Sequence, residues 1–312
     1  MTDELNRIQS LLQDKADYQA RIKLIPYDGT PEIKEKESGR YLYIRKRTGG
    51  RLTSTYVGIY SDDLFQLLLR NAEELRRLRK KVRQIDKDLA ALGYQAEQLT
   101  PRVILNLDFA RANMKANIYD QAVLEGVATT FPQTENIIDN GKVSGMTASD
   151  IQKILNLKHA WEFILDSDVI QARTDYYLLS NIAKLVNEGF FYDGGRIRTV
   201  PVSIGGSRYG PPVPVEYDVK EMIRDIISSG NDAVDTAIEL CLYCMKSQIF
   251  LDGNKRASVI FANHYLIAHG QGCLVIPEAN VPEFKKLLVS FYEGKEETTI
   301  RDFLRKHCWK PL

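Results

Sequence analysis

The sequence predicts a mostly α-helical protein, in which a helical domain with one short β-hairpin follows a helical arm that carries a small β-hairpin of its own. Two observations lead to this prediction. Long stretches place apolar residues three and four positions apart, as helices do, and two short stretches alternate β-branched or aromatic residues with polar ones, as strands do. The 312 residues, 44% of them hydrophobic, suffice for a large and a smaller core. We expect the arm over residues 1–98 and the larger domain over residues 99–312.

The overall charge and the cysteine content exclude several classes of protein. The 42 basic and 41 acidic residues nearly cancel, so no net field attracts the chain to nucleic acid or to a membrane surface. The sequence has four cysteines, no apolar leader and no apolar run near twenty residues. A disulfide framework, secretion and a membrane span are therefore not expected, and the expected location is the cytoplasm.

The arm begins with two helices that should pack together. From Leu68 onward, apolar residues alternate steps of three and four, which is the pattern of a coiled-coil seam. A shorter stripe of Leu5, Ile8 and Leu12 is its expected antiparallel partner. Gly93 is expected to end the long helix. The apolar residues of the long seam are Leu75, Leu78, Val82, Ile85, Leu89 and Leu92.

A β-hairpin is predicted between these helices, from two runs at residues 40–47 and 51–58 joined by Thr48, Gly49 and Gly50. Its basic residues interleave with tyrosines, a composition found on nucleic-acid surfaces and also on edge strands that carry charge to stay soluble. Because the net charge is nearly zero, nucleic-acid binding is the weaker alternative, and a contact with a protein or with a second copy of the chain is favoured. The residues are Arg45, Lys46, Arg47, Arg51, Tyr41, Tyr43 and Tyr56.

The larger domain is predicted to be helical apart from one interruption. Residues 196–214 contain two short alternating runs about Gly205 and Gly206, closed by prolines that forbid a helix. Cys241 and Cys244 lie in an apolar helical run without further metal-ligating residues nearby, so we expect core thiols rather than a zinc site. The predicted helices cover residues 106–127, 149–166, 167–188, 219–229, 232–248, 254–269 and 282–293.

The segment from Asp252 to Arg256 joins two apolar helices and places backbone N–H groups at a helix N-terminus, where anions bind. Gly253 allows close approach of a ligand, and Asn254 adds donors. Asp252 offers the hard oxygen that Mg²⁺ prefers, and Lys255 and Arg256 add positive charge. The functional interpretation is a magnesium–nucleotide phosphate site, and the alternative is an ordinary turn between two helices.

The whole segment Gln248–Arg256, QIFLDGNKR, resembles the signature HxFx(D/E)GN(G/K)R of the Fic/Doc (Fido) family, with glutamine in place of the histidine. Residues 195–214 look like the β-hairpin flap of that family, with Ile204, Gly205 and Gly206 at its turn. Residues 106–166 look like the early Fic helices. The resemblance extends from about Leu99 to the end of the chain and implies the helical Fic fold.

Fic enzymes most often transfer AMP from Mg–ATP to a Ser, Thr or Tyr hydroxyl of a protein, so the resemblance implies ATP and Mg²⁺ as ligands and a protein, or the chain itself, as target. It implies that Phe250 anchors the loop, that Asp252 holds Mg²⁺, and that Arg256 grips the outer phosphates. The implied nucleotide-binding residues are Gly253, Asn254, Lys255 and Arg256, and the implied catalytic ones are Gln248, Asn254 and Arg256.

Gln248 occupies the position of the family's general base. A glutamine amide cannot accept a proton at neutral pH, and losing a general base slows a reaction by roughly 10²–10⁴-fold. Three interpretations follow. The chain is a weak or unusual adenylyltransferase, or a degenerate Fic-like module that binds nucleotide and partners, or an active enzyme altered at one residue.

Residues 121–126, QAVLEG, resemble the inhibitory helix motif (S/T)xxxE(G/N) of many Fic proteins, placed here in a helix near residues 118–127. Glu125 and Gly126 match the motif, and Gln121 departs from it. In the family the glutamate pairs with a second arginine of the signature, a position that Val259 holds here. We therefore expect Glu125 to find another cation, Arg256, or to face solvent. The alternative is a plain helix end with Gly126 as its cap.

Overall fold

The computed structural model describes residues 2–48, 51–95, 98–295 and 297–312. The chain divides into two compact units, Met1–Ala96 and Glu97–Leu312. Among the described residues, no helix combines the length and the apolar character that crossing a membrane would require.

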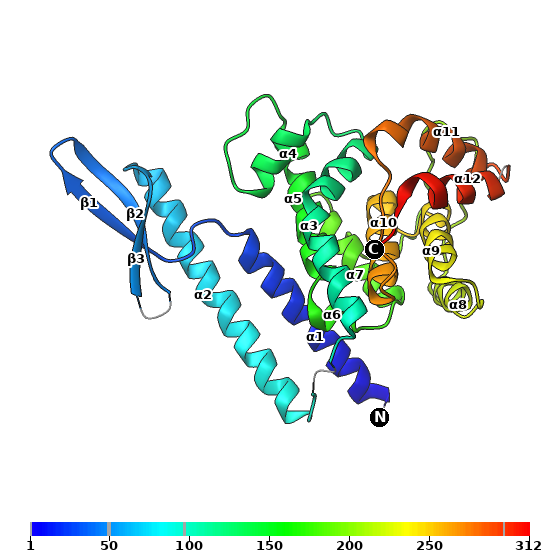
Figure 1. Cartoon of the computed structure of the whole chain (residues 1–312), viewed down its shortest axis with the longest axis horizontal. Helices are drawn as coiled ribbons and strands as arrows, with labels where there is room; N and C mark the ends of the chain where they lie inside the picture. The colour runs from blue at the N-terminus through cyan, green and yellow to red at the C-terminus, as the bar shows by residue number, and fades with distance from the viewer. Residues whose placement is uncertain (1, 49–50, 96–97, 296) are drawn as a thin grey trace. The chain divides into compact units, whose positions relative to one another are not determined.

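The first unit is built on two antiparallel helices, α1 (Thr2–Leu24) and α2 (Asp62–Ala91), which lie side by side in Figure 1. Leu12 of α1 packs against Ile85 and Leu89 of α2, so the expected apolar stripes do meet. The helix α2 starts earlier than its leucine pattern indicates, because the Ser61 side chain accepts a hydrogen bond from the Leu64 backbone and caps it. Gly93, with φ of 67°, follows the helix end as expected.

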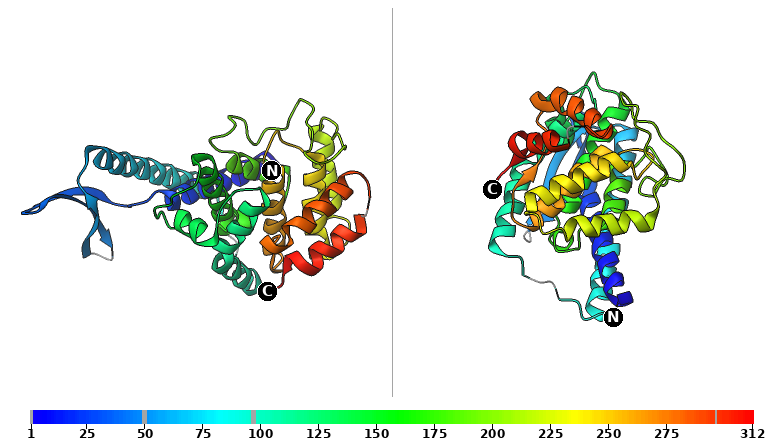
Figure 2. Two further views of the ribbon diagram at one scale, coloured as in Figure 1. Left: turned by 90° about the horizontal axis from the view of Figure 1, so that it is seen from above. Right: turned by 90° about the vertical axis from the view of Figure 1, so that its right-hand side faces the viewer.

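A three-stranded antiparallel sheet, rather than a hairpin, connects the two helices. Its order is β1 (Thr30–Lys36), β2 (Gly39–Thr48), β3 (Arg51–Ile59), and Figure 2 shows it at the N-terminal end of α2. The strand β1 was not predicted because its sequence, TPEIKEK, is mostly charged and polar. Leu42 and Ile44 of β2 are buried against Leu68 of α2, so one face of the sheet is covered and the other is open. The expected turn residues Gly49 and Gly50 lie outside the described residues.

The second unit is helical, and its other helices surround α10, which Figure 1 shows in orange. The helix α10 contacts α3, α5, α7 and α9, and all its residues except Lys255 and Ala268 are buried. The helices are α3 (Pro101–Leu124), α4 (Phe131–Ile138), α5 (Ala148–Ile164), α6 (Ser167–Ile170), α7 (Tyr176–Val186), α8 (Glu216–Ile227), α9 (Ala233–Ser247), α10 (Asn254–Ala268), α11 (Val281–Tyr292) and α12 (Glu297–Phe303). The short elements are β4 (Cys273–Leu274), the 3₁₀ turn η1 (Glu278–Asn280), the π-helical turn η2 (Leu304–Cys308) and β5 (Trp309–Lys310).

The helices of this unit differ from the prediction at α6 and α7, at α4, and at α12, which was not predicted either. The single helix expected over residues 167–188 is split into α6 and α7, because the Asp175 side chain accepts a hydrogen bond from the Leu178 backbone and starts a new helix. The helix α4 was not predicted, because its eight residues, FPQTENII, are too short and too polar to show a period. A capping box formed by Thr130 and Gln133 stabilises its start.

The flap keeps its turn but not the strand pairing that was expected. The Ser207 N–H donates to the Ile204 carbonyl at 3.2 Å across Gly205 and Gly206, yet the described segment on either side contains no strand. Several of its residues are prolines, which have no N–H to donate to a ladder. The two arms of the flap are instead joined through the buried Arg198, which donates to the carbonyl oxygens of Val200 at 2.7 Å and Pro212 at 2.6 Å.

All four cysteines are free and buried. Burial raises the pKa values of the Cys273 and Cys308 thiols to about 12. Burial also raises the pKa values of Cys241 and Cys244 in α9, so these two are core thiols, as expected.

Candidate functional site

The loop between α9 and α10 turns sharply at both of its ends. Gln248 ends α9 in the left-handed conformation, with φ of 44° and ψ of 59°, and Gly253 starts α10 with φ of 74°. The first conformation is costly for a residue with a side chain and is held by its surroundings. Between these turns Phe250 is buried in the core. The loop is therefore short, anchored and fixed in shape.

Asn254 holds this shape with its side chain. Its Oδ1 accepts a hydrogen bond from the Phe250 N–H at 3.0 Å, and its Nδ2 donates to the Phe250 carbonyl at 2.8 Å. The same Nδ2 donates to Oε1 of Gln248 at 3.2 Å. Because the amide is committed to the loop, the groups left for an anion are the N–H groups in the first turn of α10, which lack intrahelical acceptors.

The Gln248 amide is also engaged at both ends. Its Nε2 donates to the Met245 carbonyl at 2.6 Å, while Oε1 accepts from Asn254. Its backbone carbonyl accepts a hydrogen bond from Nε of Arg198 at 2.5 Å. Burial lowers the pKa of Arg198, whose guanidinium is satisfied by carbonyl oxygens. Arg198 thus connects the base of the flap to the start of the loop.

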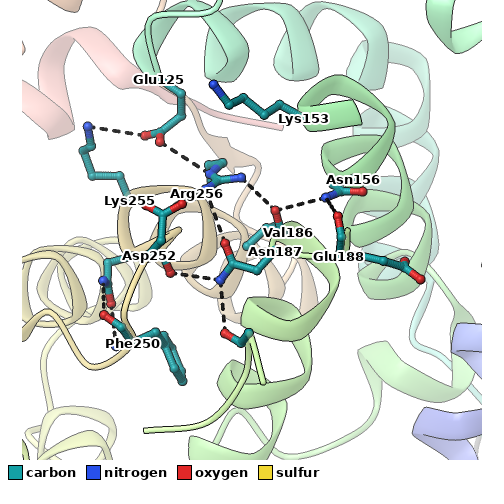
Figure 3. Close-up of polar contacts among 12 residues, drawn as sticks. Glu125, Lys153, Asn156, Val186, Asn187, Glu188, Phe250, Asp252, Lys255 and Arg256 are labelled. Atoms are coloured by element: carbon teal, nitrogen blue, oxygen red, sulfur yellow. Dashed lines mark hydrogen bonds and ion pairs between the residues drawn. The ribbon is translucent and has the colours of Figure 1, made fainter. Parts of the chain in front are cut away.

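Arg256 lies behind the loop, with its side chain only 3% exposed. It donates to the Val186 carbonyl at 2.7 Å and to Oδ2 of Asp252 at 2.8 Å. Its Nε lies 3.4 Å from Oε2 of Glu125 (Figure 3). Through these contacts the Arg256 guanidinium holds the loop in place from its buried side. It does not line the cavity described next.

Glu125 is held by two cations of the loop. Its Oε2 pairs with Arg256, and its Oε1 lies 3.5 Å from Nζ of Lys255. The expectation that Glu125 turns to Arg256, since Val259 is apolar and buried, is confirmed. Gly126, with φ of 78°, follows the end of α3.

The departure of Gln121 from the inhibitory motif has a structural reason. Its Nε2 donates to the Arg256 carbonyl at 2.9 Å, and its Oε1 accepts from Nε1 of Trp161 at 3.1 Å. The side chain of a serine or threonine is too short to reach both groups. Gln121 and Glu125, one turn apart on α3, thus hold the backbone and the side chain of the same arginine.

Asn187, at the end of α7, belongs to the site although no sequence motif predicted it. Its Nδ2 donates to the Asp252 carbonyl at 2.9 Å, and its Oδ1 accepts from Arg256 at 3.3 Å (Figure 3). A Cβ atom on Gly253 would lie 2.6 Å from that Oδ1. Glycine is therefore required here both by its positive φ and by the contact with Asn187.

A cavity of about 420 Å³ opens in front of the loop. It is lined by Gln248 and the residues from Asp252 to Lys255, by Glu125, by the flap residues Ser203, Ile204 and Gly205, and by Lys285, Leu288, Val289 and Tyr292 of α11. The structure thus brings the predicted loop, flap and inhibitory residues to one cavity, except that Arg256 is buried behind it and that Gly126 and Gly206 are not in its lining. A larger cavity of about 730 Å³ lies beside Thr174, Lys220 and His269 and contains no residue of the loop.

Lys285 is a site residue that sequence reasoning missed. It is exposed on α11, lines the cavity, and forms no ion pair with another described residue. Its ammonium group is therefore available to an anionic ligand, whereas that of Lys255 is shared with Glu125.

Asp252 is the candidate metal ligand. Its side chain is 53% exposed, its Oδ2 accepts from Arg256, and its Oδ1 forms no hydrogen bond or ion pair with another described residue. The described part of the chain contains no cluster of three or more His, Cys, Asp or Glu that could hold a metal by itself. A single carboxylate oxygen fits Mg²⁺, which proteins commonly bind through one or two carboxylates together with substrate phosphates.

The comparisons with known proteins agree with this geometry. Residues 167–266, which include the loop, match the family model described as Fic/DOC family. Residues 1–66 match a model described as a domain of unknown function, DUF6788. A protein adenylyltransferase Fic of Drosophila willistoni is 25% identical over 258 residues, which are 77% of this chain and 51% of that protein. The chain thus spans about half the length of this relative. These matches support a Fic/DOC family domain in the chain.

Solved structures with a similar fold are also Fic proteins. Fic-1 (residues 134–508) of C. elegans superposes with a TM-score of 0.52 at 18% identity, covering 78% of this chain and 73% of its own. A Fic-domain signalling protein of Bacteroides thetaiotaomicron gives 0.51 at 16% identity, covering 62% and 76%. A Fic family protein of Desulfovibrio desulfuricans gives 0.52 at 16%, covering 68% and 74%. At these identities the likeness shows the fold, a mostly helical one of Fic type.

Proposed function

We propose that the cavity binds ATP with Mg²⁺ and that the protein transfers AMP slowly to a hydroxyl group of a protein, or of the chain itself. The observation that carries this proposal is the meeting of three segments at one cavity: the QIFLDGNKR loop at the start of α10, the turn of the flap, and Glu125 at the end of α3. The support from known proteins is the match to the Fic/DOC model and the relative described as a protein adenylyltransferase.

Different residues of the cavity bind different parts of the Mg–triphosphate. The first turn of α10 offers backbone N–H groups to a phosphate, and Gly253 leaves room for it. Lys285 supplies a free ammonium, and Lys255 supplies a second one when it leaves Glu125. Asp252 would hold Mg²⁺, which neutralises phosphate charge when it is bound. Arg256 acts as a positioning residue, because it fixes the carboxylate of Asp252 from behind.

In the proposed reaction, the hydroxyl oxygen of the target attacks the α-phosphorus of ATP. The bond from this phosphorus to the oxygen bridging the α- and β-phosphates breaks, and pyrophosphate leaves. The hydroxyl proton goes to solvent water, because Gln248 cannot accept it. The Gln248 carboxamide can still orient the attacking hydroxyl through a hydrogen bond. We therefore expect a rate roughly 10²–10⁴-fold below that of a site with a general base.

Incubation with Mg²⁺ and ATP labelled at the α-phosphate tests the proposal. The Gln248→His variant should incorporate label roughly 10²–10⁴-fold faster than the unchanged chain. Gln248→Ala serves as the control and should show no gain. ATP labelled at the γ-phosphate should leave no label on protein. If neither the unchanged chain nor Gln248→His becomes labelled from the α-position, the transfer activity is wrong.

A second candidate is a module that binds nucleotide and partners without turnover. The observation in its favour is that the Gln248 amide is tied at both ends, to Met245 and Asn254, in a site whose arginine is buried. Calorimetry separates the two candidates. A module binds ATP with an affinity that falls in Lys285→Ala, and it shows no labelling in the assay above.

A further inference from the structure

The open face of the sheet in the first unit gathers tyrosines and cations. In the strand register Tyr43 is opposite Glu32 on one side and Tyr56 on the other, and Tyr41 is opposite Lys34. Since side chains alternate between the faces of a strand, the face opposite the buried Leu42 and Ile44 contains Thr30, Leu52, Ser54 and Ile59. Its charged and aromatic residues are Glu32, Lys34, Lys36, Tyr41, Tyr43, Arg45, Arg47 and Tyr56. This set is called the tyrosine face below.

The tyrosines hold two lysines in place on this face. The ring of Tyr56 lies 5.5 Å from that of Tyr43 and 6.2 Å from that of Tyr41, so the three rings form one cluster. Nζ of Lys34 lies 4.4 Å above the Tyr43 ring, and Nζ of Lys36 lies 5.6 Å from the Tyr41 ring. Cation–π attraction of this kind orients an ammonium while leaving it hydrated. The two lysines are thus held on an aromatic base, and Lys34 also donates a hydrogen bond to the Ser54 hydroxyl at 2.8 Å.

The charges of the tyrosine face are mostly unbalanced. Arg45 and Arg47 are exposed and form no ion pair with another described residue. The carboxylate of this set is Glu32, which lies 3.6 Å from Nζ of Lys34. Four cations therefore share the face with one carboxylate, a local excess that the nearly neutral total charge of the chain conceals. A partner that complements the tyrosine face carries negative charge at regular spacing.

One end of the sheet has a shape that fits the major groove of DNA. The strand β1 pairs with β2 only as far as Arg45, whereas β2 and β3 continue their pairing through Lys46–Thr53 and Arg47–Leu52. The end of the sheet is therefore a two-stranded ribbon that carries Arg47 and Arg51, together with Lys46, which pairs with Asp28. The major groove of B-form DNA, about 12 Å wide, admits a two-stranded β-ribbon.

We propose that the tyrosine face and its ribbon bind duplex DNA, mainly through the phosphate backbone. Duplex is favoured over a single strand because lysines lie over the Tyr43 and Tyr41 rings, which leaves those rings less open to stacking bases. It is favoured over double-stranded RNA because the deep major groove of an A-form helix is too narrow for a ribbon. The preference for a protein partner over nucleic acid rested on total charge, whereas this proposal rests on the local charge of one face.

Fluorescence anisotropy of the full-length chain with a labelled DNA duplex of about two helical turns tests the proposal. Each neutralised phosphate contributes a slope of about 0.9 in a plot of log affinity against log salt, so four cations give a slope of about 3 to 4. Arg45→Ala combined with Arg47→Ala should lower the slope by about 2 and weaken binding about tenfold or more at low salt.

Arg83→Ala combined with Lys87→Ala is the matched control, because it removes the same charge from exposed residues of α2 in the same unit. It should leave the affinity and the slope nearly unchanged. The proposal is overturned if both double variants weaken binding equally, or if a single strand or an RNA duplex of equal length binds more tightly. Absence of binding at low salt also overturns it, and would assign the face to a protein partner or a second copy of the chain.

Discussion

At the scale of single residues, the site is defined by how its charges are shared. Glu125 is 13% exposed and lies between Lys255 and Arg256. Its carboxylate therefore neutralises positive charge that would otherwise attract a triphosphate. A buried ion pair of this kind adds little net stability, because desolvation offsets the attraction. Its effect is therefore expected on ligand binding rather than on folding.

The Glu125→Gln variant should accordingly bind ATP more tightly. Removing the carboxylate frees Lys255 for phosphate, while Arg256 keeps its bonds to Val186 and Asp252. We expect the dissociation constant measured by calorimetry to fall about tenfold, equivalent to about 1.4 kcal/mol. The control is Glu135→Gln, a change at an exposed carboxylate that pairs with Lys115. Equal affinity in both variants would show that Glu125 does not restrain binding.

Gly253→Ala tests the contact between the loop and Asn187. The change imposes a side chain at φ of 74° and places Cβ at 2.6 Å from Oδ1 of Asn187. Gly145→Ala is a matched control, since Gly145 has a similar φ of 76° with open space around it. Strained conformations cost about 1–3 kcal/mol, and the Gly253 variant should lie at or above the top of this range, with Gly145 near the bottom. The measurement is the free energy of unfolding in urea, and similar losses in the two variants would contradict a role for Asn187.

His264 should make stability depend on pH. The side chain is fully buried in α10, where burial lowers its pKa to about 4 from the usual 6.5. Nδ1 lies 2.9 Å from the Thr174 hydroxyl, and Nε2 lies 2.8 Å from the Val169 carbonyl. In the folded state the imidazole is neutral above pH 4, whereas in the unfolded state it gains a proton below about 6.5. The unfolded state is therefore favoured progressively as the pH falls between these values.

Protonation of His264 should thus leave the free energy of unfolding unchanged above about pH 6.5. Below that value, it should lower this free energy by up to about 3 kcal/mol as the pH falls toward 4. Thermal unfolding at several pH values, for the unchanged chain and for His264→Gln, measures it. The variant should lose part of the pH dependence in this window. Parallel curves for the two proteins would show that His264 does not cause it.

At the scale of helices and strands, the elements predicted from the sequence are those whose apolar residues repeat with one period or that contain a contiguous motif. The helices α3, α5, α9, α10 and α11 were expected because their apolar residues repeat over long stretches. The strand β1 and the helix α4 were missed because charged and polar residues dominate them, and their stability comes from pairing and capping. The split between α6 and α7 depends on the Asp175 cap within a segment that otherwise reads as one helix.

The same distinction applies to the site. Residues 248–256 could be read as a phosphate-binding loop because they are contiguous, and Glu125 could be matched to Arg256 by charge and burial. Asn187, Arg198 and Lys285 could not, because they reach the loop only through the folding of distant segments. The flap was predicted as paired strands from its alternation, whereas its prolines make the Arg198 side chain the bridge between its arms.

Arg198→Met should therefore loosen the flap. Methionine replaces the aliphatic stem of arginine but offers no donors, so the carbonyl oxygens of Val200, Pro212 and Gln248 lose their partner. Limited proteolysis should cut residues 199–214 several times faster in this variant. Arg208→Met, which changes an exposed arginine of the same flap, is the control and should leave the rate unchanged. Equal cleavage in both variants would contradict the bridging role.

At the scale of the whole molecule, the chain consists of two units, each with its own packed interior. Leu42, Ile44 and Leu68 form a buried cluster in the first unit, and α10 forms the centre of the second. The two proposals fall on different units, since the tyrosine face lies within residues 30–59 and the ATP cavity within residues 125–292. The two activities should therefore be separable.

Fragments 1–95 and 98–312 test this separation. Each should unfold cooperatively by circular dichroism, because the buried clusters described above lie within one unit or the other. The longer fragment should bind ATP as the full chain does, and the shorter one should retain DNA affinity within about threefold, or about 0.7 kcal/mol. A fragment that fails to unfold cooperatively would show that the units depend on each other for folding.

The left-handed conformation of Gln248 also has a consequence for the history of the site. The turn is fixed by the bond from Arg198 to its carbonyl and by the anchored Phe250, neither of which depends on which side chain position 248 carries. Glutamine and histidine codons differ by one base. A single nucleotide change could therefore place an imidazole at position 248 without altering the two contacts that fix the turn, and an equally small change could remove it.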